Sequence, residues 1–158
     1  MSDSPAVTVL KPAPAMPAGA RIGIDLVHVD RIAASIESFG DRFSHRLFSA
    51  GELRDCTVAG RLDSTLLALR FAAKEATLKA FDLSGAGIGW SQIELTEGAG
   101  FAGRIRLHGR AARSVARFGT YEIAVTTSQD DGMACAIVVA LPCNRPADTD
   151  KNEKSDDR

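Results

Sequence analysis

Apolar residues alternate with other residues in the segment Arg21-Ile22-Gly23-Ile24-Asp25-Leu26-Val27. This period of two predicts a strand with Ile22, Ile24 and Leu26 on one face and Asp25 on the opposite face. A polar side chain opposite the apolar face of a strand usually meets solvent. Asp25 is therefore either an ordinary surface residue or the part of a site that this strand contributes.

Start and stop signals predict two short helices after this strand. The first is expected to begin at Asp30, a candidate N-cap, and to end at Gly40. Ser49 and Glu52 have the spacing of a capping box, which predicts the start of a second helix.

The strongest helical pattern covers residues 64–81, where Ala and Leu dominate and where Ser64 or Thr65 can cap the first turn. A glycine-rich link follows at 85–89. The rest predicts strands near 90–96, 103–108, 121–127 and 133–141, and an arginine-rich helix at about 110–118. Helices and strands do not alternate regularly, so the pattern favours an α+β fold over a doubly wound sheet.

Length and charge narrow the class of protein. The chain has 158 residues, with 19 Lys or Arg against 20 Asp or Glu. We expect one domain at 21–141, between a Pro/Ala-rich tail at 1–20 and a charged tail at 142–158, both disordered. A balanced charge argues against a nucleic-acid binder with a broad basic surface. No apolar run approaches the roughly 18 residues that span a bilayer, so no membrane partner is expected either.

The three cysteines show no metal-ligand spacing, and residues 1–20 lack the pattern of a secretory signal. Both observations favour reduced thiols and a cytoplasmic location.

The long predicted helix carries the residues best suited to chemistry. Arg70 and Lys74 are four positions apart, as are Glu75 and Lys79, so the two pairs form neighbouring stripes on the helix. A carboxylate near three cations suits a site for a divalent metal ion and phosphate oxygens. The same spacing is also common on a solvated helix face. The glycines at 85–89 either let phosphate approach the backbone or form a flexible connection, because they match no full phosphate-binding motif.

Two segments together resemble the holo-acyl-carrier-protein synthase family of 4′-phosphopantetheinyl transferases. Residues 22–27, Ile-Gly-Ile-Asp-Leu-Val, are similar to that family's opening Gly-(Ile/Leu)-Asp strand. Residues 70–81, Arg-Phe-Ala-Ala-Lys-Glu-Ala-Thr-Leu-Lys-Ala-Phe, are similar to its Arg-Phe-Ala-x-Lys-Glu-Ala-x-x-Lys-Ala helix. The two segments occur in the family's order, and the likeness covers about residues 21–141.

The resemblance implies an antiparallel sheet with a long helix packed on it. It also implies the transfer of phosphopantetheine from coenzyme A, the co-substrate, to a serine of an apo acyl carrier protein or carrier domain, with release of adenosine 3′,5′-bisphosphate. Mg²⁺ is the implied cofactor, and fatty acid biosynthesis the implied pathway. The implied assembly is a homotrimer with active sites between adjacent subunits. The carrier stays open, because fatty-acid, polyketide and peptide-synthetase carriers share an acidic recognition helix.

The same resemblance implies roles for individual residues. Asp25 and Glu75 match the metal ligands, and Lys79 matches a lysine that contacts phosphate and stabilises the leaving group; all three are expected to be catalytic. The expected coenzyme A contacts are Arg70, Lys74, Lys79, Gly87 and Thr127. The expected carrier contacts are Arg31, which matches a family position, and Arg42 and Arg46, which have the right charge. The arginines between 104 and 117 are an alternative with the same charge. Either Glu75 or a metal-bound water is expected to accept the serine proton.

One departure from the family pattern favours an alternative function. Many members carry histidine where this chain has Thr127. The alternative is a non-catalytic homologue that binds coenzyme A or a carrier protein. A nucleotide phosphatase-like enzyme is a third hypothesis, for which the sequence offers no separate motif.

Overall fold

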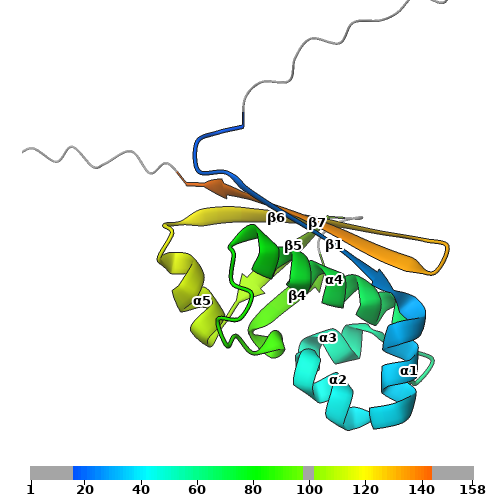
Figure 1. Cartoon of the computed structure of the whole chain (residues 1–158). Coiled ribbons are helices and arrows are strands. Elements are labelled where there is room, and N and C mark those ends of the chain that lie inside the picture. Colours follow the sequence, from blue (N-terminus) through cyan, green and yellow to red (C-terminus); the bar gives the residue numbers. More distant parts are fainter. Residues whose placement is uncertain (1–15, 98–101, 144–158) are drawn as a thin grey trace, which may run out of the picture.

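A computed structural model describes residues 16–97 and 102–143 (Figure 1). Most of the tails expected at 1–20 and 142–158 lies outside these residues, and the disorder of the tails stays a prediction. No helix in the described part of the chain is long and apolar enough to cross a membrane.

A five-stranded antiparallel sheet, in the order β1-β7-β6-β5-β4, is the main structural layer. Its strands are β1 (Arg21–His28), β4 (Ile93–Glu97), β5 (Ala102–Leu107), β6 (Tyr121–Asp130) and β7 (Met133–Pro142). The first and last strands of the chain are neighbours, paired along the whole length of β1. All five strands of this sheet were expected and are confirmed, except that the segment expected to begin near residue 90 forms β4 only from Ile93.

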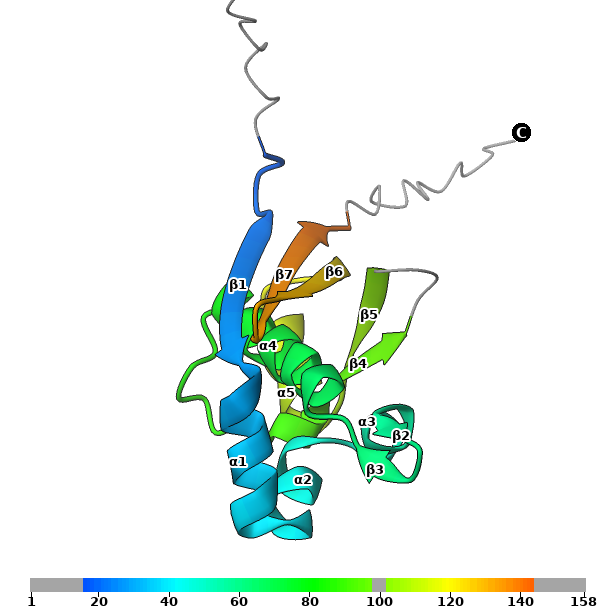
Figure 2. The same cartoon turned by 90° about the vertical axis from the view of Figure 1, so that its right-hand side faces the viewer.

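Helices lie on one side of the strands β1, β7 and β6 (Figure 1). They are α1 (Val29–Phe39), α2 (Asp41–Leu47), α3 (Ala50–Asp55), α4 (Ser64–Ala80), α5 (Gly109–Ala116) and the short 3-10 helix η1 (Trp90–Gln92). A small hairpin of β2 (Thr57–Val58) and β3 (Arg61–Leu62) precedes α4. Figure 2 shows α4 packed along the sheet, where its main contacts are with β1 and β7. The α+β class and the long helix on an antiparallel sheet are confirmed.

Helix starts follow local capping chemistry, with one correction for α4. The predicted capping box is present at α3: Ser49 Oγ accepts from the N–H of Glu52 at 3.1 Å, and Glu52 Oε2 accepts from the N–H of Ser49 at 2.9 Å. Helix α4 is capped by Asp63, whose Oδ1 accepts a backbone N–H of the first turn at 2.9 Å. The prediction of Ser64 or Thr65 as its cap was wrong by one or two positions.

The start of α1 is a second correction. Its N-cap is His28, which makes no side-chain capping bond, and Asp30 lies within the first turn. The reason is that β1 continues in register with β7 up to His28, so the helix begins directly where the ladder ends. The helix ends as predicted at Gly40, which has a φ of 54° and donates its N–H to Ile36 O at 2.8 Å.

The two faces of β1 have unexpected environments. Ile22, Ile24 and Leu26 share one face as predicted, but they are 55%, 52% and 60% exposed in the single chain. The opposite face, which carries Asp25, covers α4, and the Asp25 side chain is only 13% exposed. Asp25 is therefore not an ordinary surface residue of the strand.

Gly23 allows β1 to lie directly against the backbone of α4. A Cβ at this position would lie 1.9 Å from the Ala76 carbonyl oxygen and 2.7 Å from the Ala80 nitrogen. Because both contacts are with backbone, the strand and helix would have to separate. We therefore expect Gly23→Ala to lower the free energy of unfolding by about 3 kcal/mol, measured by denaturant unfolding.

Gly89→Ala is the matched control for this prediction. Gly89 has an ordinary φ of −72°, and a Cβ there would come no closer than 3.8 Å to another residue. We expect this control to change stability by less than about 1 kcal/mol. Equal losses in the two variants would show that the close approach at Gly23 is unimportant.

Candidate active site

Three charged side chains from β1 and α4 meet in one cavity. Lys79 Nζ donates to Asp25 Oδ1 at 2.6 Å, which joins the helix to the strand. Glu75 lies one turn before Lys79 on the same helix face. All three line a cavity of about 480 Å³, the first cavity, which also has walls from α1 and α2.

This arrangement follows from the packing of β1 on α4. The period of two puts Asp25 on the same strand face as Gly23, where the backbones of strand and helix come closest. On the helix side, Ala72 and Ala76 are fully buried, and these small side chains leave room for the strand. A short carboxylate on the strand then comes within reach of the long Lys79 side chain.

The carboxylates of Asp25 and Glu75 in the first cavity are not balanced by Lys79 alone. Burial raises the pKa of the Glu75 carboxyl above its ordinary value, the negative charge of Asp25 raises it further, and Lys79 partly opposes both. The hydrogen bond to Asp25 raises the pKa of the Lys79 ammonium, so this lysine is firmly cationic at neutral pH. Two carboxylates thus share the cavity with Lys79, which is paired with one of them.

The carboxylates have the donor chemistry of a magnesium site. Asp25 and Glu75 supply hard oxygen atoms, and Mg²⁺ is commonly held by one or two carboxylates together with water and substrate phosphates. Across residues 16–97 and 102–143, no group of three or more His, Cys, Asp and Glu side chains forms a metal-binding cluster. The pair therefore fits an ion that takes its other ligands from water and substrate.

A second cavity, of about 350 Å³, lies on the other side of Glu75. Its wall includes residues of the glycine-rich link, with Gly85 at a φ of 82° and Gly87 at 65°. Trp90 continues that wall beyond the link. The structure thus brings the predicted contact Gly87 into the same region as Glu75.

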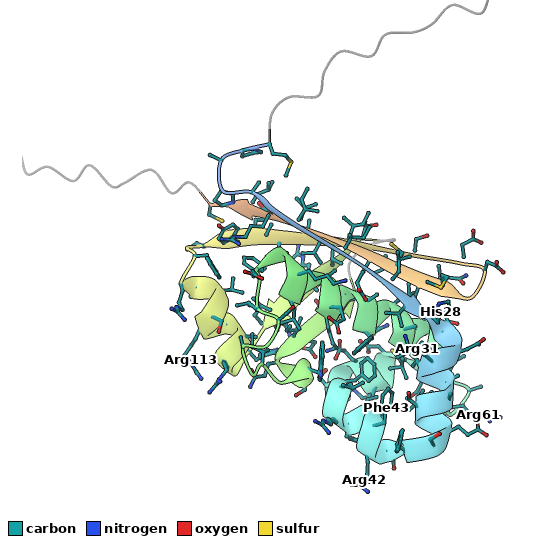
Figure 3. The ribbon with its side chains drawn as sticks, viewed as in Figure 1. His28, Arg31, Arg42, Phe43, Arg61 and Arg113 are labelled. Carbon is teal, nitrogen blue, oxygen red and sulfur yellow. The ribbon has the colours of Figure 1, made fainter. Side chains whose placement is uncertain are left out.

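Three predicted carrier contacts, Arg31, Arg42 and Arg46, are exposed on α1 and α2. Arg31 lines the first cavity together with Lys79. Arg42 and Arg46 line a neighbouring surface pocket, and Phe43 belongs to both (Figure 3). The three arginines therefore border one continuous surface that begins at the first cavity.

Two predicted coenzyme A contacts, Arg70 and Lys74, are turned into the protein interior. Lys74 is fully buried, and its Nζ donates to Glu52 Oε2 at 2.7 Å, to Trp90 O at 3.1 Å and to Ile93 O. Burial lowers the pKa of Lys74, and the charge of Glu52 opposes this shift. The three donors of the ammonium are thus engaged within the chain, and the expected contact of Lys74 with coenzyme A stays a prediction.

Arg70 is 3% exposed and contacts Leu66 O at 3.4 Å and Asp55 Oδ2 at 3.8 Å. Arg70 lines neither the first nor the second cavity, and its expected contact with coenzyme A stays a prediction. The physical reason for its burial is that α3 and β4 cover this stripe of α4.

Thr127 lies on the same row of the sheet as the first cavity, but at a distance from it. It pairs with Ala136 of β7, which pairs in turn with Asp25 of β1. Two strand spacings, about 10 Å, therefore separate Thr127 from Asp25. Its predicted contact with coenzyme A stays a prediction.

Among the residues of the first cavity that sequence reasoning missed, two were marked by helical spacing. Phe71 precedes Glu75 by four residues, and Ser35 follows Arg31 by four. In each case the spacing of four places the missed residue on the same helix face as a predicted one. That signal was available in the sequence.

The antiparallel sheet and the carboxylate–lysine group between strand and helix can be compared with known proteins. Residues 21–138 match the family model of the 4′-phosphopantetheinyl transferase superfamily, and the chain belongs to this superfamily. The matched residues include all the described strands in full except β7, which continues beyond residue 138 to Pro142.

Similar proteins carry more specific names. The holo-[acyl-carrier-protein] synthase of Desulforudis audaxviator is 40% identical over 120 residues, covering 76% of this chain and 91% of the relative. That of Gloeobacter violaceus is 39% identical, covering 77% and 92%. A solved structure of the Helicobacter pylori holo-[acyl-carrier-protein] synthase in complex with coenzyme A is 29% identical, with a TM-score of 0.65, covering 76% of this chain and 99% of that chain. A Chronobacterium ammoniagenes ACPS-CoA complex is 27% identical, with a TM-score of 0.66, covering 78% and 97%.

Proposed function

We propose that the protein is a holo-[acyl-carrier-protein] synthase. It transfers 4′-phosphopantetheine from coenzyme A to a serine of an apo acyl carrier protein and releases adenosine 3′,5′-bisphosphate. The observation that carries the proposal is the meeting of Asp25, Glu75 and Lys79 in one cavity of about 480 Å³. Relatives of this name, and similar structures bound to coenzyme A, support it.

The transfer breaks one bond and forms one. The serine oxygen of the carrier attacks the phosphorus that bears pantetheine, and the bond from this phosphorus to the bridging oxygen of the diphosphate breaks. The bridging oxygen leaves with the bonding electron pair on adenosine 3′,5′-bisphosphate. Lys79, held in the first cavity by its 2.6 Å bond to Asp25, would place a positive charge where the leaving group becomes more negative. The serine proton passes to Glu75 or to a water.

Dependence on Mg²⁺ is the finer part of this proposal. Asp25 and Glu75 would hold the ion, and two carboxylates are enough for an ion that keeps waters and phosphate oxygens. When bound, Mg²⁺ supplies charge neutralisation and alignment of the diphosphate. The raised pKa of Glu75 supports this assignment, because two carboxylates facing one cavity favour a divalent cation between them.

Intact-mass spectrometry tests the activity directly. The protein is incubated with coenzyme A, Mg²⁺ and apo carriers of the fatty-acid, polyketide and peptide-synthetase classes. We expect one phosphopantetheine per carrier, none when the acceptor serine is replaced by alanine, and none when the metal is chelated. Absence of transfer to every carrier would overturn the proposal. Calorimetric binding of coenzyme A without transfer would favour the non-catalytic homologue that Thr127 suggests. A cytoplasmic location and a place in fatty acid biosynthesis stay predictions.

Docking of the carrier is proposed on the surface bordered by Arg31, Arg42 and Arg46. Their positive charges would pair with the acidic helix of the carrier. We expect the Kd of the complex to rise about tenfold between low and high salt, because screening weakens exposed charge pairs. Arg46→Glu should raise the KM for the carrier and leave the KM for coenzyme A unchanged, because Arg46 lines the neighbouring pocket and not the first cavity.

The control for this charge reversal is Arg113→Glu. Arg113 is exposed on α5, at the opposite end of the molecule from α1 (Figure 3). It should leave both KM values unchanged. Carrier binding that does not depend on salt would refute the electrostatic account.

A further inference from the structure

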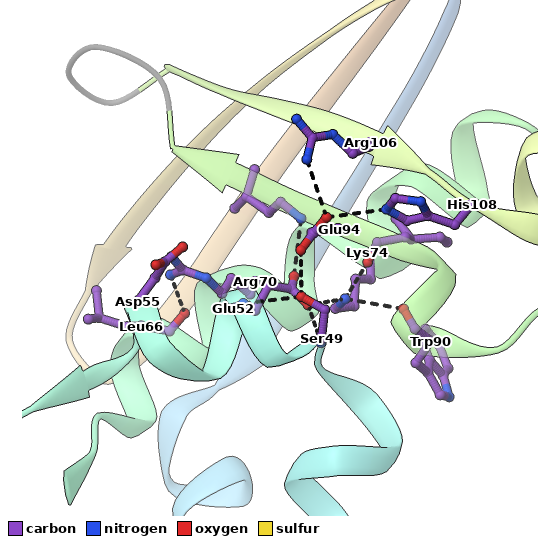
Figure 4. A network of polar contacts seen from close by, with 12 residues as sticks. Ser49, Glu52, Asp55, Leu66, Arg70, Lys74, Trp90, Glu94, Arg106 and His108 are labelled. Atoms are coloured by element: carbon purple, nitrogen blue, oxygen red, sulfur yellow. Dashed lines mark hydrogen bonds and ion pairs between the residues drawn. The ribbon is translucent and has the colours of Figure 1, made fainter. Parts of the chain in front are cut away.

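A buried ion pair joins α4 to α3, and its lysine also binds the segment that follows the glycine-rich link (Figure 4). Lys74 on α4 and Glu52 on α3 are both inaccessible to solvent, with 2.7 Å between Nζ and Oε2. The other two bonds of the ammonium go to the carbonyl oxygens of Trp90 and Ile93. The Lys74 ammonium thus donates hydrogen bonds to α3, to η1 and to the start of β4.

Glu52 is anchored equally well from the other side. Its Oε2 accepts from the N–H of Ser49 at 2.9 Å, and its Oε1 accepts from the N–H of Leu95 at 3.1 Å. The carboxylate is therefore held by a helix start and by a strand of the sheet. A buried ion pair is weak support for stability, because desolvation of both ions offsets their attraction. This pair is bound by four backbone groups of other residues, so it fixes the relative positions of α3, α4 and the segment around Trp90 more than it adds stability.

The segment that the Lys74 ammonium holds, which includes Trp90, borders the proposed site. Trp90, whose carbonyl binds Lys74, lines the second cavity, and its ring packs on Phe71 with 5.2 Å between centroids. Phe71 lines the first cavity, and Glu75 lines both cavities. Lys74 precedes Glu75 in the chain. The ion pair therefore holds the aromatic pair that lies between the carboxylate site and the end of the glycine-rich link.

We propose that Lys74 and Glu52 are positioning residues for coenzyme A: they hold the end of the glycine-rich link against α4 and so place Trp90 in the wall of the second cavity. This inference rests on the proposed function, and it assigns that cavity to part of the coenzyme A molecule. Lys74 acts here through Trp90 rather than by touching a phosphate.

The single tryptophan makes the test independent of activity, because Trp90 alone is responsible for the tryptophan emission. In the protein without substrate, Lys74→Met should shift the emission to longer wavelength, since Trp90 loses its carbonyl anchor and becomes more exposed. The KM for coenzyme A should rise at least about tenfold, with a much smaller change in the KM for the carrier. A role in stability alone would lower the active fraction and leave both KM values unchanged.

Lys79→Met is the matched control on the same helix. It should abolish turnover and leave the emission of the free protein unchanged, because Lys79 does not contact the Trp90 segment. If Lys74→Met fails to fold, the double variant Glu52→Gln/Lys74→Met removes both charges of the pair and takes its place in the same measurements.

An unchanged emission in the folded variant, or an unchanged KM for coenzyme A, would overturn the positioning role. A direct phosphate contact by Lys74 would raise that KM without the shift in emission. If the wild-type protein transfers nothing to any carrier, the proposed function fails. The emission shift then still reports whether Lys74 holds Trp90, and calorimetry of coenzyme A binding replaces the KM.

Discussion

Replacing Glu75 by glutamine is expected to lower the rate of phosphopantetheine transfer by about a hundredfold or more. The substitution keeps the size of the side chain and removes its negative charge. One of the two carboxylates that would hold Mg²⁺ is then neutral, and one of the two candidate acceptors of the serine proton is lost. The measurement is kcat at saturating coenzyme A, Mg²⁺ and carrier. A rate equal to that of the wild type would remove Glu75 from the mechanism.

Stability should separate this loss from unfolding. Burial and the charge of Asp25 raise the pKa of Glu75 in the folded protein, so the folded state binds that proton more tightly than the unfolded chain does. The ionised carboxyl therefore costs stability, and this cost develops as the pH rises from the unfolded pKa through the folded pKa. At neutral pH without metal, Glu75→Gln should be at least as stable as the wild type. Glu37→Gln, on the exposed surface of α1, is the control and should leave both kcat and stability unchanged.

Each segment of the candidate site was predictable because its own signals are local. Glu75 and Lys79 lie one helical turn apart, and a helix expected at 64–81 was found at Ser64–Ala80. Asp25 was placed on its own strand face by a period of two, which the structure confirms. The resemblance to a known family joined the two segments, which lie about 50 residues apart. No periodicity within either segment could have paired them.

Arg70 and Lys74 show where the sequence pattern loses information. Helix α4 is buried on most of its surface, and its Ala-rich sequence does not distinguish a core face from a site face. The partner that turns Lys74 inward is Glu52, 22 residues earlier, and the sequence marks that residue only as the end of a capping box. A charged side chain on a helix is usually exposed, so the burial of Arg70 and Lys74 was not expected from the sequence.

Strand β1 shows a related ambiguity. The alternation of apolar and other residues in β1 predicted which residues share a face of the strand. It did not predict which of the two faces packs against the core of the same chain. Ile22, Ile24 and Leu26 were read as the apolar face, and the structure leaves them exposed while Gly23 and Val27 are packed inside. The extra apolar face has no covering element within the described residues.

Assembly of the protein should depend on the outer face of the sheet. Ile24 of β1 pairs with Ile137 of β7, and Ile22 pairs with Val139, so apolar side chains of two strands form one surface. Ile24 and Ile137 are 52% and 38% exposed. Apolar surface of this kind on a sheet marks an interface. We propose that it is the contact between subunits of the homotrimer that the family resemblance implies.

Ile24→Lys is expected to convert the proposed trimer to monomers and to lower transferase activity by about tenfold or more, because the family resemblance implies active sites between adjacent subunits. Light scattering coupled to size exclusion measures the mass, and the transfer assay measures the activity. The variant should still fold, since the Ile24 side chain points away from the core of its own chain. Val58→Lys is the matched control, because Val58 is similarly exposed at 53% but lies in the separate hairpin of β2 and β3. A trimer that survives Ile24→Lys, or a wild-type protein that is monomeric yet fully active, would show that this face has another use and that each chain completes its own site.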